Sequence, residues 1–297
     1  MVFRELYPEL EAASHALLSL CEPLIKQKGE RLGLTPAQVS MLLMAPAFQP
    51  AALSARLLNI GAPTASTLHL HKQLQTLKEK EMLTELGEGD YRLTEFGQTT
   101  IQEIKHNWTV SLAGIQPLST TDMMDLGSRL KDMADACTRA PDPPGTWCIR
   151  LLRKLDPGSH APMMVRISQF INELRAYRED SHMAAWRGYK VNGHAWDILT
   201  YLWAEEFASI LVINQALGNM GHTLDETQSA AESLVRKGWV NQNDGGLWIS
   251  ETGTEVWNIV KNATDDFYMV PFRNLPAAEI ARTLELLTAF RKGIPVY

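Results

Sequence analysis

Cysteine is scarce in this chain, and its pattern excludes two kinds of site. The three cysteines, Cys21, Cys137 and Cys148, stand at irregular spacing among 297 residues. An odd number at such spacing provides neither a disulfide framework nor a zinc-ligand set. This usage favours a reducing cytoplasm. We also expect no secretory signal, because the first residues lack a basic start followed by an apolar stretch.

Long hydrophobic runs and an excess of basic charge are also missing. No apolar run approaches the ~20 residues that cross a bilayer, so we expect no membrane partner. The net charge is −6, from 28 Lys and Arg against 34 Asp and Glu. Both halves of the chain share this acidic balance. It excludes a strongly basic nucleic-acid binder but leaves a local basic face open.

The motifs of common enzymes are absent from the sequence. It contains no glycine-rich phosphate loop, no Gly-x-Ser-x-Gly and no His-Glu-x-x-His. The carboxylates are spread along the expected helices as solvated faces. We therefore expect a protein that is not an enzyme, with no catalytic residues, metal or cofactor. A catalytic site assembled from distant residues stays the least favoured alternative.

What the sequence does contain is an internal repeat. Residues 93–97 (Leu-Thr-Glu-Phe-Gly) resemble residues 249–253 (Ile-Ser-Glu-Thr-Gly), and residues 77–83 resemble 234–240 at nearly the same offset. Matches in the same order at a nearly constant offset indicate two copies of one unit. We expect copy one over residues 1–140, a proline-rich linker over 141–160, and copy two over 161–297.

Both copies predict the same order of elements, so the expected fold class is α+β and mostly α. In copy one we expect a helix over 6–28, and a second helix that begins after a cap at Thr35-Pro36-Ala37-Gln38. Two more helices are expected over 50–58 and 64–80, followed by strands over 82–86 and 90–93. Two further helices are expected to begin at Thr94 and at Ser119. In copy two we expect helices over 163–183, 211–217 and 223–237, and strands over 240–242 and 247–249 around an Asn-Asp-Gly-Gly turn. We expect Gly61 to end its short helix in the left-handed conformation.

Helix, short helix, turn, helix and hairpin in this order make a winged helix-turn-helix. With long helices on either side, each copy resembles the MarR family of bacterial regulators. The resemblance rests on residues 74–83 and 93–97, and on 234–240 and 249–253 in copy two. It implies outer helices that form a dimer core, a second motif helix in the DNA major groove, and release by a small ligand or an oxidised cysteine. Two tandem domains in one chain would form an intrachain pseudo-dimer. Whether two chains pair further stays open.

The wings depart from the family pattern. The family's Asp-x-Arg usually stands several residues before the Leu-Thr, whereas Asp90-Tyr91-Arg92 directly precedes Leu93. The wing of copy one is therefore short, and Arg92 is expected in its last strand. Copy two has no Lys or Arg between Val240 and Gly253.

One face of the helix expected over 64–80 carries the candidate contacts to double-stranded DNA. Its leucines (Leu70, Leu74 and Leu77) recur at helical spacing and should point inward. The predicted DNA contacts are Ser66, Thr67, His69, His71, Lys72 and Gln75, together with Arg92. Such side chains bond phosphates and base edges, and the alternative is a solvated polar face. His69 and His71 diverge around the helix, so we expect no shared metal ion.

The matching helix of copy two is acidic. Its corresponding positions are Leu224, Asp225, Gln228, Ser229 and Glu232, with Glu226 nearby. A Thr223–Glu226 capping box would explain Glu226 structurally. Carboxylates in that turn would still repel phosphates. We therefore expect an asymmetric pair. Copy one would contact DNA, and copy two would sense an effector or support copy one.

Copy two is also rich in tryptophan, which suggests a place for a small aromatic effector. The candidate ligand-binding residues are His182, Trp186, Tyr189, Trp196 and Trp203. An aromatic crevice with a few polar groups is a usual ligand site, and the alternative is plain aromatic core. Among the cysteines, Cys148 is the more exposed candidate for redox sensing, although lone thiols are usually inert.

The sequence thus predicts a ligand-responsive, DNA-binding transcriptional regulator of MarR type. The alternative is a winged-helix protein that has lost DNA binding and serves as a small-molecule- or protein-binding module. The acidic helix of copy two and the net charge favour this alternative.

Overall fold

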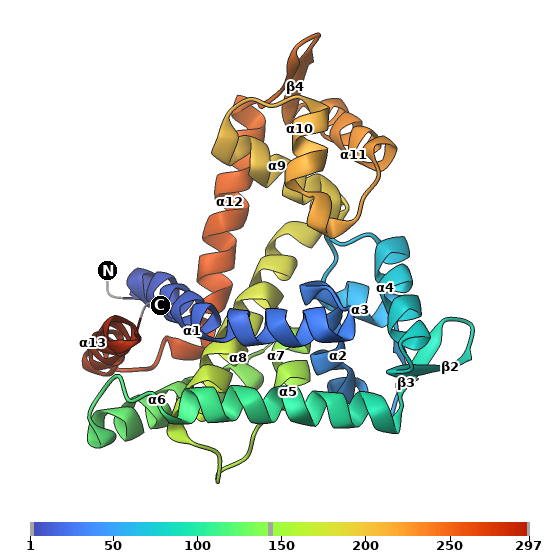
Figure 1. Cartoon of the computed structure of the whole chain (residues 1–297). Coiled ribbons are helices and arrows are strands. Elements are labelled where there is room, and N and C mark those ends of the chain that lie inside the picture. Colours follow the sequence, from blue (N-terminus) through green and yellow to red (C-terminus); the bar gives the residue numbers. More distant parts are fainter. Residues whose placement is uncertain (1–2, 142–144, 296–297) are drawn as a thin grey trace.

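The computed structural model describes residues 3–141 and 145–295, which are mostly helical (Figure 1). The first half contains α1 (Phe3–Leu32), α2 (Pro36–Met44), η1 (Ala45–Phe48), β1 (Leu53–Ser54), α3 (Ala55–Gly61), α4 (Thr67–Glu79), β2 (Leu83–Gly87), β3 (Asp90–Leu93), α5 (Glu95–Ala113) and α6 (Thr120–Thr138). Next comes α7 (Trp147–Arg153). The second half contains α8 (Met163–Arg187), α9 (Gly193–Glu205), α10 (Ile210–Ala216), η2 (Gly218–Met220), α11 (Leu224–Arg236), β4 (Val240–Asn243), β5 (Gly246–Ile249), α12 (Glu251–Tyr268), η3 (Val270–Phe272) and α13 (Ala277–Gly293).

Side-chain caps start the helices at matching places in the two halves. Thr94 before α5 and Ser250 before α12 each accept a hydrogen bond from the amide of a glycine three residues later. Ser66 and Thr223 likewise cap α4 and α11. Thr35 makes the predicted capping box with Gln38 at the start of α2. Because these oxygens satisfy amides that have no partner inside the helix, the local sequence fixes where each helix begins.

The short helix of the first half begins later than predicted, at Ala55 instead of residue 50. Residues Leu53 and Ser54 are extended because they pair with Tyr91 and Asp90 of the wing. Gly61 is the last residue of this helix but does not adopt the expected left-handed conformation. A Cβ atom at Gly61 would lie only 2.4 Å from the ring of Trp147, so this glycine permits close packing.

The segment expected as a linker contains a packed helix, α7. Ile149 of α7 is fully buried. The carboxylate of Asp180 on α8 accepts hydrogen bonds from the amides of Cys148 and Ile149, at 2.8 and 3.1 Å. A carboxylate in this position satisfies the free amides of the first helical turn. The prolines at 143 and 144 lie outside the described residues.

Each half carries a small antiparallel wing. In the first half the strand order is β1-β3-β2, with Leu83 opposite Leu93 and Thr84 opposite Arg92. In the second half β4 pairs with β5, and an isolated bridge joins Ala208 to Leu247. This bridge precedes α10 as β1 precedes α3 in the first half. In the second wing the strand equivalent to β1 is therefore reduced to one residue pair.

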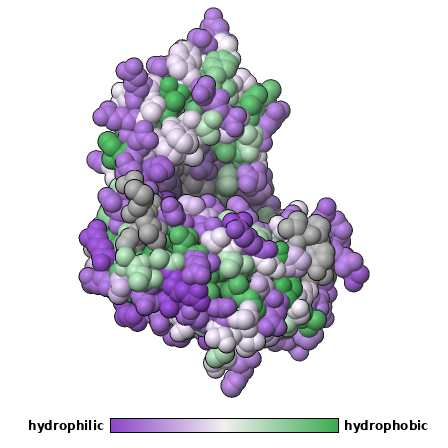
Figure 2. Space-filling model, turned by 90° about the vertical axis from the view of Figure 1, so that its left-hand side faces the viewer, coloured by the Kyte–Doolittle hydropathy of each residue, from purple (hydrophilic) through white to green (hydrophobic). Residues whose placement is uncertain are grey.

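The buried side chains form three clusters. The first lobe is the cluster within residues 34–104, built around Leu42, Leu74 and Leu77. The second lobe is the cluster within residues 183–260, built around Trp196 and Leu234. In Figure 2, which views the molecule from the left side of Figure 1, hydrophobic surface residues form small groups among hydrophilic ones.

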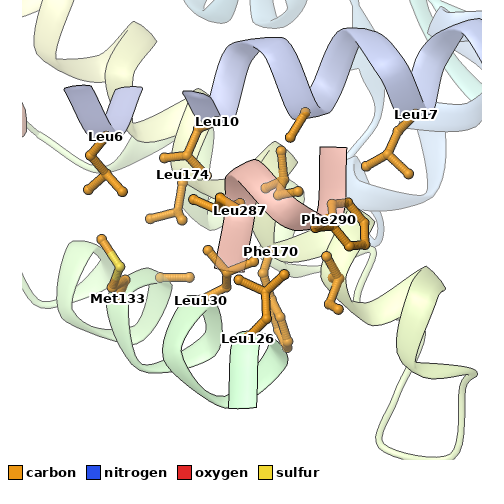
Figure 3. Close-up of a cluster of buried hydrophobic side chains, with 14 of the residues drawn as sticks. Leu6, Leu10, Leu17, Leu126, Leu130, Met133, Phe170, Leu174, Leu287 and Phe290 are labelled. Carbon is orange, nitrogen blue, oxygen red and sulfur yellow. The ribbon is translucent and has the colours of Figure 1, made fainter. Parts of the chain in front are cut away.

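The third cluster, the central core, joins the two halves of the chain. Its side chains come from α1, α6, α8 and α13 and point toward one another (Figure 3). They include Leu6, Leu10, Leu126, Leu130, Phe170, Leu174, Leu287 and Phe290. Ion pairs on the rim, such as Arg282 with Asp122 and Arg291 with Glu9, also cross between the halves. These ion pairs are half-buried and still meet solvent, so they contribute modestly, and apolar burial holds the halves together. None of the helices among the described residues has the length and apolar character needed to cross a membrane.

Leu174→Ala tests the shared core. Leu174 is fully buried, so its truncation should lower the free energy of unfolding by about 2–5 kcal/mol. Since the core belongs to both halves, thermal unfolding followed by tryptophan fluorescence and by far-UV circular dichroism should give coincident transitions. The control Met124→Ala, at an exposed position on α6, should change stability by less than about 0.5 kcal/mol. Two separate transitions in the unaltered protein would contradict the shared core.

Candidate nucleic-acid interface and ligand cavity

The helix α4 places its apolar stripe as the sequence predicts. Leu70, Leu74 and Leu77 are buried in the first lobe. Thr67, Lys72 and Gln75 are exposed on the outer face of the same helix. The wing places Arg92 in β3, exposed and opposite Thr84. The outer face of α4 and the wing thus offer hydroxyl, amide and cationic groups to solvent.

Three of the predicted DNA contacts are less accessible. Ser66 is only 5% exposed, and its hydroxyl caps α4 by accepting from the amide of His69. Ser66 is therefore a structural cap and not a free DNA contact. His69 is half-buried and bonds Gln73, at 3.2 Å between nitrogens. The half-buried ring of His71 lies 6.3 Å from the ring of Tyr91.

Charge on this face is uneven. Lys78 forms an ion pair with Glu85 of β2, and this hydrogen bond raises the pKa of Lys78 and lowers that of Glu85. Within residues 3–141 and 145–295, neither Lys72 nor Arg92 takes part in an ion pair. These two exposed cations are therefore available to meet a phosphate backbone.

The corresponding helix of the second half, α11, has an acidic first turn. Thr223 and Glu226 make the predicted capping box, and the Thr223 amide lowers the pKa of Glu226. Gln228 bonds Glu232 along the helix. The other outward positions, Leu224, Asp225 and Ser229, are exposed. The first turn of α11 therefore carries negative charge where α4 carries none.

The aromatic residues considered for an effector site pack mainly against one another. Trp186 and Trp196 stack with their ring centres 6.2 Å apart, and they are 4% and 2% exposed. His182 bonds Thr264 at 3.2 Å, and Tyr189 packs edge-on against Trp239. Trp203 stacks on Trp257 and is 41% exposed. The five residues therefore do not share one open crevice, because the rings of Trp186 and Trp196 fill the space between their helices.

A cavity of about 680 Å³ lies elsewhere, between the first lobe and the central helices. Its walls come from the end of α2 and η1, and from α5, α7 and α8. The apolar lining includes Leu43, Phe48, Ile104, Trp108, Trp147 and Leu151. This size and apolar lining suit a small organic ligand. Sequence reasoning missed the cavity because several separate elements form it. The one sequence signal is that the two tryptophans of the first 150 residues, Trp108 and Trp147, both line it.

A few polar groups converge on the cavity. Lys105 and Arg175 bring positive charge, and Gln169 and Asn172 bring amides. Loss of hydration lowers the pKa of Lys105. Burial raises the pKa of Glu179, against the opposing effect of Arg175 and Arg178. The cavity is therefore apolar inside, with charged groups available to orient one polar end of a ligand.

The cysteines lack the features of reactive thiols. Burial raises the pKa of Cys21 to about 11 and that of Cys137 well above its ordinary value. Burial, and then the charge of Asp180, raise the pKa of Cys148. Because the thiolate is the reactive form, these shifts disfavour redox sensing at neutral pH.

Two histidines stack where the lobes meet. The rings of His194 and His222 lie 3.7 Å apart, and His222 Nε2 donates to the carbonyl oxygen of Thr64 at 2.8 Å. Burial, and then the nearby His222, lower the pKa of His194 to about 4. Burial raises the pKa of Asp197, on the same helix as His194, to about 6. Both groups are therefore held largely neutral in the folded protein near pH 5.

Comparisons with known proteins give one match. Residues 157–295 match the model of a helix-turn-helix family. The match spans α8 to α13 and so includes α10, α11 and the second wing. This match indicates a helix-turn-helix DNA-binding domain in the second half of the chain. No curated protein and no solved structure matches the chain.

The histidine at 194 should make stability depend on pH. Its pKa is about 4 when folded and about 6.5 when unfolded, so below pH 7 the unfolded chain binds the extra proton. Stability is therefore lost as pH falls from 7 toward 4. His194→Gln should reduce the loss between pH 7 and pH 5 by about 2 kcal/mol, measured by urea denaturation. The raised pKa of Asp197 acts in the opposite direction and is present in both proteins. The exposed control His160→Gln should leave the pH profile unchanged, and an unchanged profile in His194→Gln would refute the assignment.

Proposed function

We propose that this chain is a DNA-binding regulator of MarR type whose two winged helix-turn-helix copies form a pseudo-dimer within one polypeptide. The helix-turn-helix match over 157–295 supports the DNA-binding domain of the second copy. The order α1 to α6 parallels α8 to α13, which supports a first copy over 1–140 and a second over 161–297. The central core supports pairing, because it buries the outer helices of both copies together.

The observation that carries the DNA-binding proposal is the exposed face of α4. Thr67, Lys72 and Gln75 lie on one solvent-facing side, and Arg92 adds a cation on the wing. Cations supply most of the non-specific affinity for DNA, and hydroxyl and amide groups bond phosphates or base edges. The acidic first turn of α11 supports the asymmetric form of the proposal, in which α4 reads DNA and α11 contributes less.

The proposed effector site is the cavity of about 680 Å³ beside α5, α7 and α8. Its tryptophans suit a small aromatic molecule, and Lys105 or Arg175 would meet a polar or anionic end. An effector that binds one lobe arrangement better than another would shift the protein toward that arrangement. This proposal replaces the tryptophans of the second lobe as the expected site.

A second candidate function is a binding module that does not contact DNA. It rests on the ion pair that engages Lys78, the acidic first turn of α11 and the net charge of −6. Salt-dependent DNA binding separates the two candidates, since phosphate contacts weaken steeply as salt rises.

The DNA-binding proposal predicts unequal roles for α4 and α11. Fluorescence anisotropy with a labelled mixed-sequence duplex should show binding at low salt that weakens as salt rises. Lys72→Ala with Gln75→Ala should weaken binding about 5- to 20-fold and reduce the salt slope by about one. Gln228→Ala with Ser229→Ala, on the outer face of α11 where Ser229 corresponds to Lys72, should change affinity by less than about twofold. Equal losses from the two double variants would refute the asymmetry. No binding by the unaltered protein at low salt would favour the binding module.

The effector proposal predicts that an aromatic acid quenches tryptophan fluorescence. With 2-naphthoate as the probe, Trp108 and Trp147 at the cavity wall should respond to saturable binding. Ala176→Phe would fill part of the cavity and should weaken binding at least tenfold. Ala184→Phe, also on α8 but outside the cavity lining, serves as the matched control and should bind normally. Equal binding by both variants would place the probe elsewhere.

A further inference from the structure

The two helix-turn-helix turns touch each other in this structure. The turn before α4 (residues 62–66) lies against the turn before α11 (residues 218–222), as Figure 1 shows where the cyan and orange segments meet. The amide of Ser66 donates to the carbonyl oxygen of Met220 at 2.9 Å. His222 Nε2 donates to the carbonyl oxygen of Thr64 at 2.8 Å, and Thr64 Oγ1 lies 3.5 Å from the sulfur of Met220. We call this set of contacts the turn–turn contact.

Glycines allow the backbones in this contact to come close. A Cβ atom at Gly221 would lie 2.1 Å from the ring of His69, and one at Gly193 would lie 2.3 Å from the carbonyl oxygen of Pro63. Neither distance is compatible with a side chain unless the turns move apart. Arg187, at the end of α8, adds a hydrogen bond to the carbonyl oxygen of Ile60. Backbone hydrogen bonds, side-chain hydrogen bonds and close packing therefore all hold the two turns together.

The turn–turn contact covers the part of α4 that a DNA groove would receive. It buries Ser66 and brings Gly221 against His69, in the first turn of the helix. It also holds the N-terminal ends of α4 and α11 against each other. The two recognition helices of a helix-turn-helix dimer enter major grooves about 34 Å apart, whereas the turns that precede α4 and α11 here are in hydrogen-bonded contact.

We propose that the turn–turn contact is an autoinhibitory latch, which must open before α4 can bind DNA. The inference rests on the proposed function, because it concerns how that function is regulated. In the closed form the hydrogen bonds of Thr64, Ser66 and Met220 hold the lobes together. The affinity measured for DNA is then reduced by the fraction of molecules that are open.

The latch is connected to the cavity through α3. Leu58, Gly61 and Ala62 line the cavity, and Ala62 begins the turn that makes the latch. The side-chain amide of Asn59 donates to the carbonyl oxygens of Ala62 and Ala65, which ties α3 to the turn. Helix α8 also serves both places, since Glu179 lines the cavity and Arg187 bonds Ile60. A ligand that displaces α3 from α7 would therefore move the turn relative to Met220 and His222.

Gly221→Ala tests the latch, because a methyl group there would overlap the ring of His69. Gly238→Ala is the matched control, since both glycines have a positive φ, 74° and 72°. Among the described residues, no atom lies within 4 Å of the place that a methyl group at Gly238 would take. Gly221→Ala should raise DNA affinity at least threefold and increase the radius of gyration measured by small-angle X-ray scattering. Gly238→Ala should change neither. Unchanged or weaker DNA binding by a folded Gly221→Ala protein would overturn the latch.

A reversible cross-link provides the second test. Thr64→Cys together with Met220→Cys introduces two thiols into the turn–turn contact, where the side chains of Thr64 and Met220 meet. Oxidation of this variant should lower DNA affinity at least tenfold, and reduction should restore it. The single variant Thr64→Cys should not respond to oxidant. Equal binding by the oxidised and reduced double variant, once the disulfide is verified by mass spectrometry, would overturn the latch.

These experiments separate the latch from the proposed function. If the unaltered protein binds DNA and neither opening nor locking changes its affinity, only the latch fails. If no form binds DNA at low salt, including the open Gly221→Ala form, the proposed function fails and the latch fails with it.

Discussion

The structure depends on the apolar contact between the outer helices of the two halves. Leucines and phenylalanines of α1, α6, α8 and α13 form one core, so neither half buries its outer helices alone. Apolar burial on this scale is non-directional and large, whereas the rim ion pairs are half-buried and contribute less. The core also fixes α8 as the common support. Helix α8 packs against α6, α7 and α12, and it lines the cavity. Its last residue, Arg187, bonds Ile60 beside the turn–turn contact.

The two halves differ in charge while sharing an order of elements. Ser66 and Thr223 cap α4 and α11 in the same way, but only α11 completes its cap with a glutamate. The difference leaves Lys72 and Arg92 exposed on one side and a carboxylate pair on the other. The two halves of a single chain can differ in this way, because they need not share one sequence as the subunits of a symmetric homodimer do.

Local chemistry explains which predictions came close. The capping box at Thr35, the hairpin around residues 243–246 and the leucine stripe of α4 depend on neighbouring residues, and the structure has all three. The predictions that failed depend on distant partners. Ser66 is buried by residues 218–222, Gly61 faces Trp147, and α7 is held by Asp180 of α8. No periodicity or spacing within a single segment records these contacts.

The sequence by itself determined most of the order of helices and strands, without β1 and α7. It also determined the inward face of α4 and the acidic first turn of α11, because caps, periodicity and charge act over a few residues. Only the tertiary structure decided the rest. It placed the cavity at the meeting of several elements, put Trp186 and Trp196 in a packed core, and brought Thr64 against Met220 across 156 residues of chain. Such contacts follow from how packed helices are oriented, which the sum of local preferences does not specify.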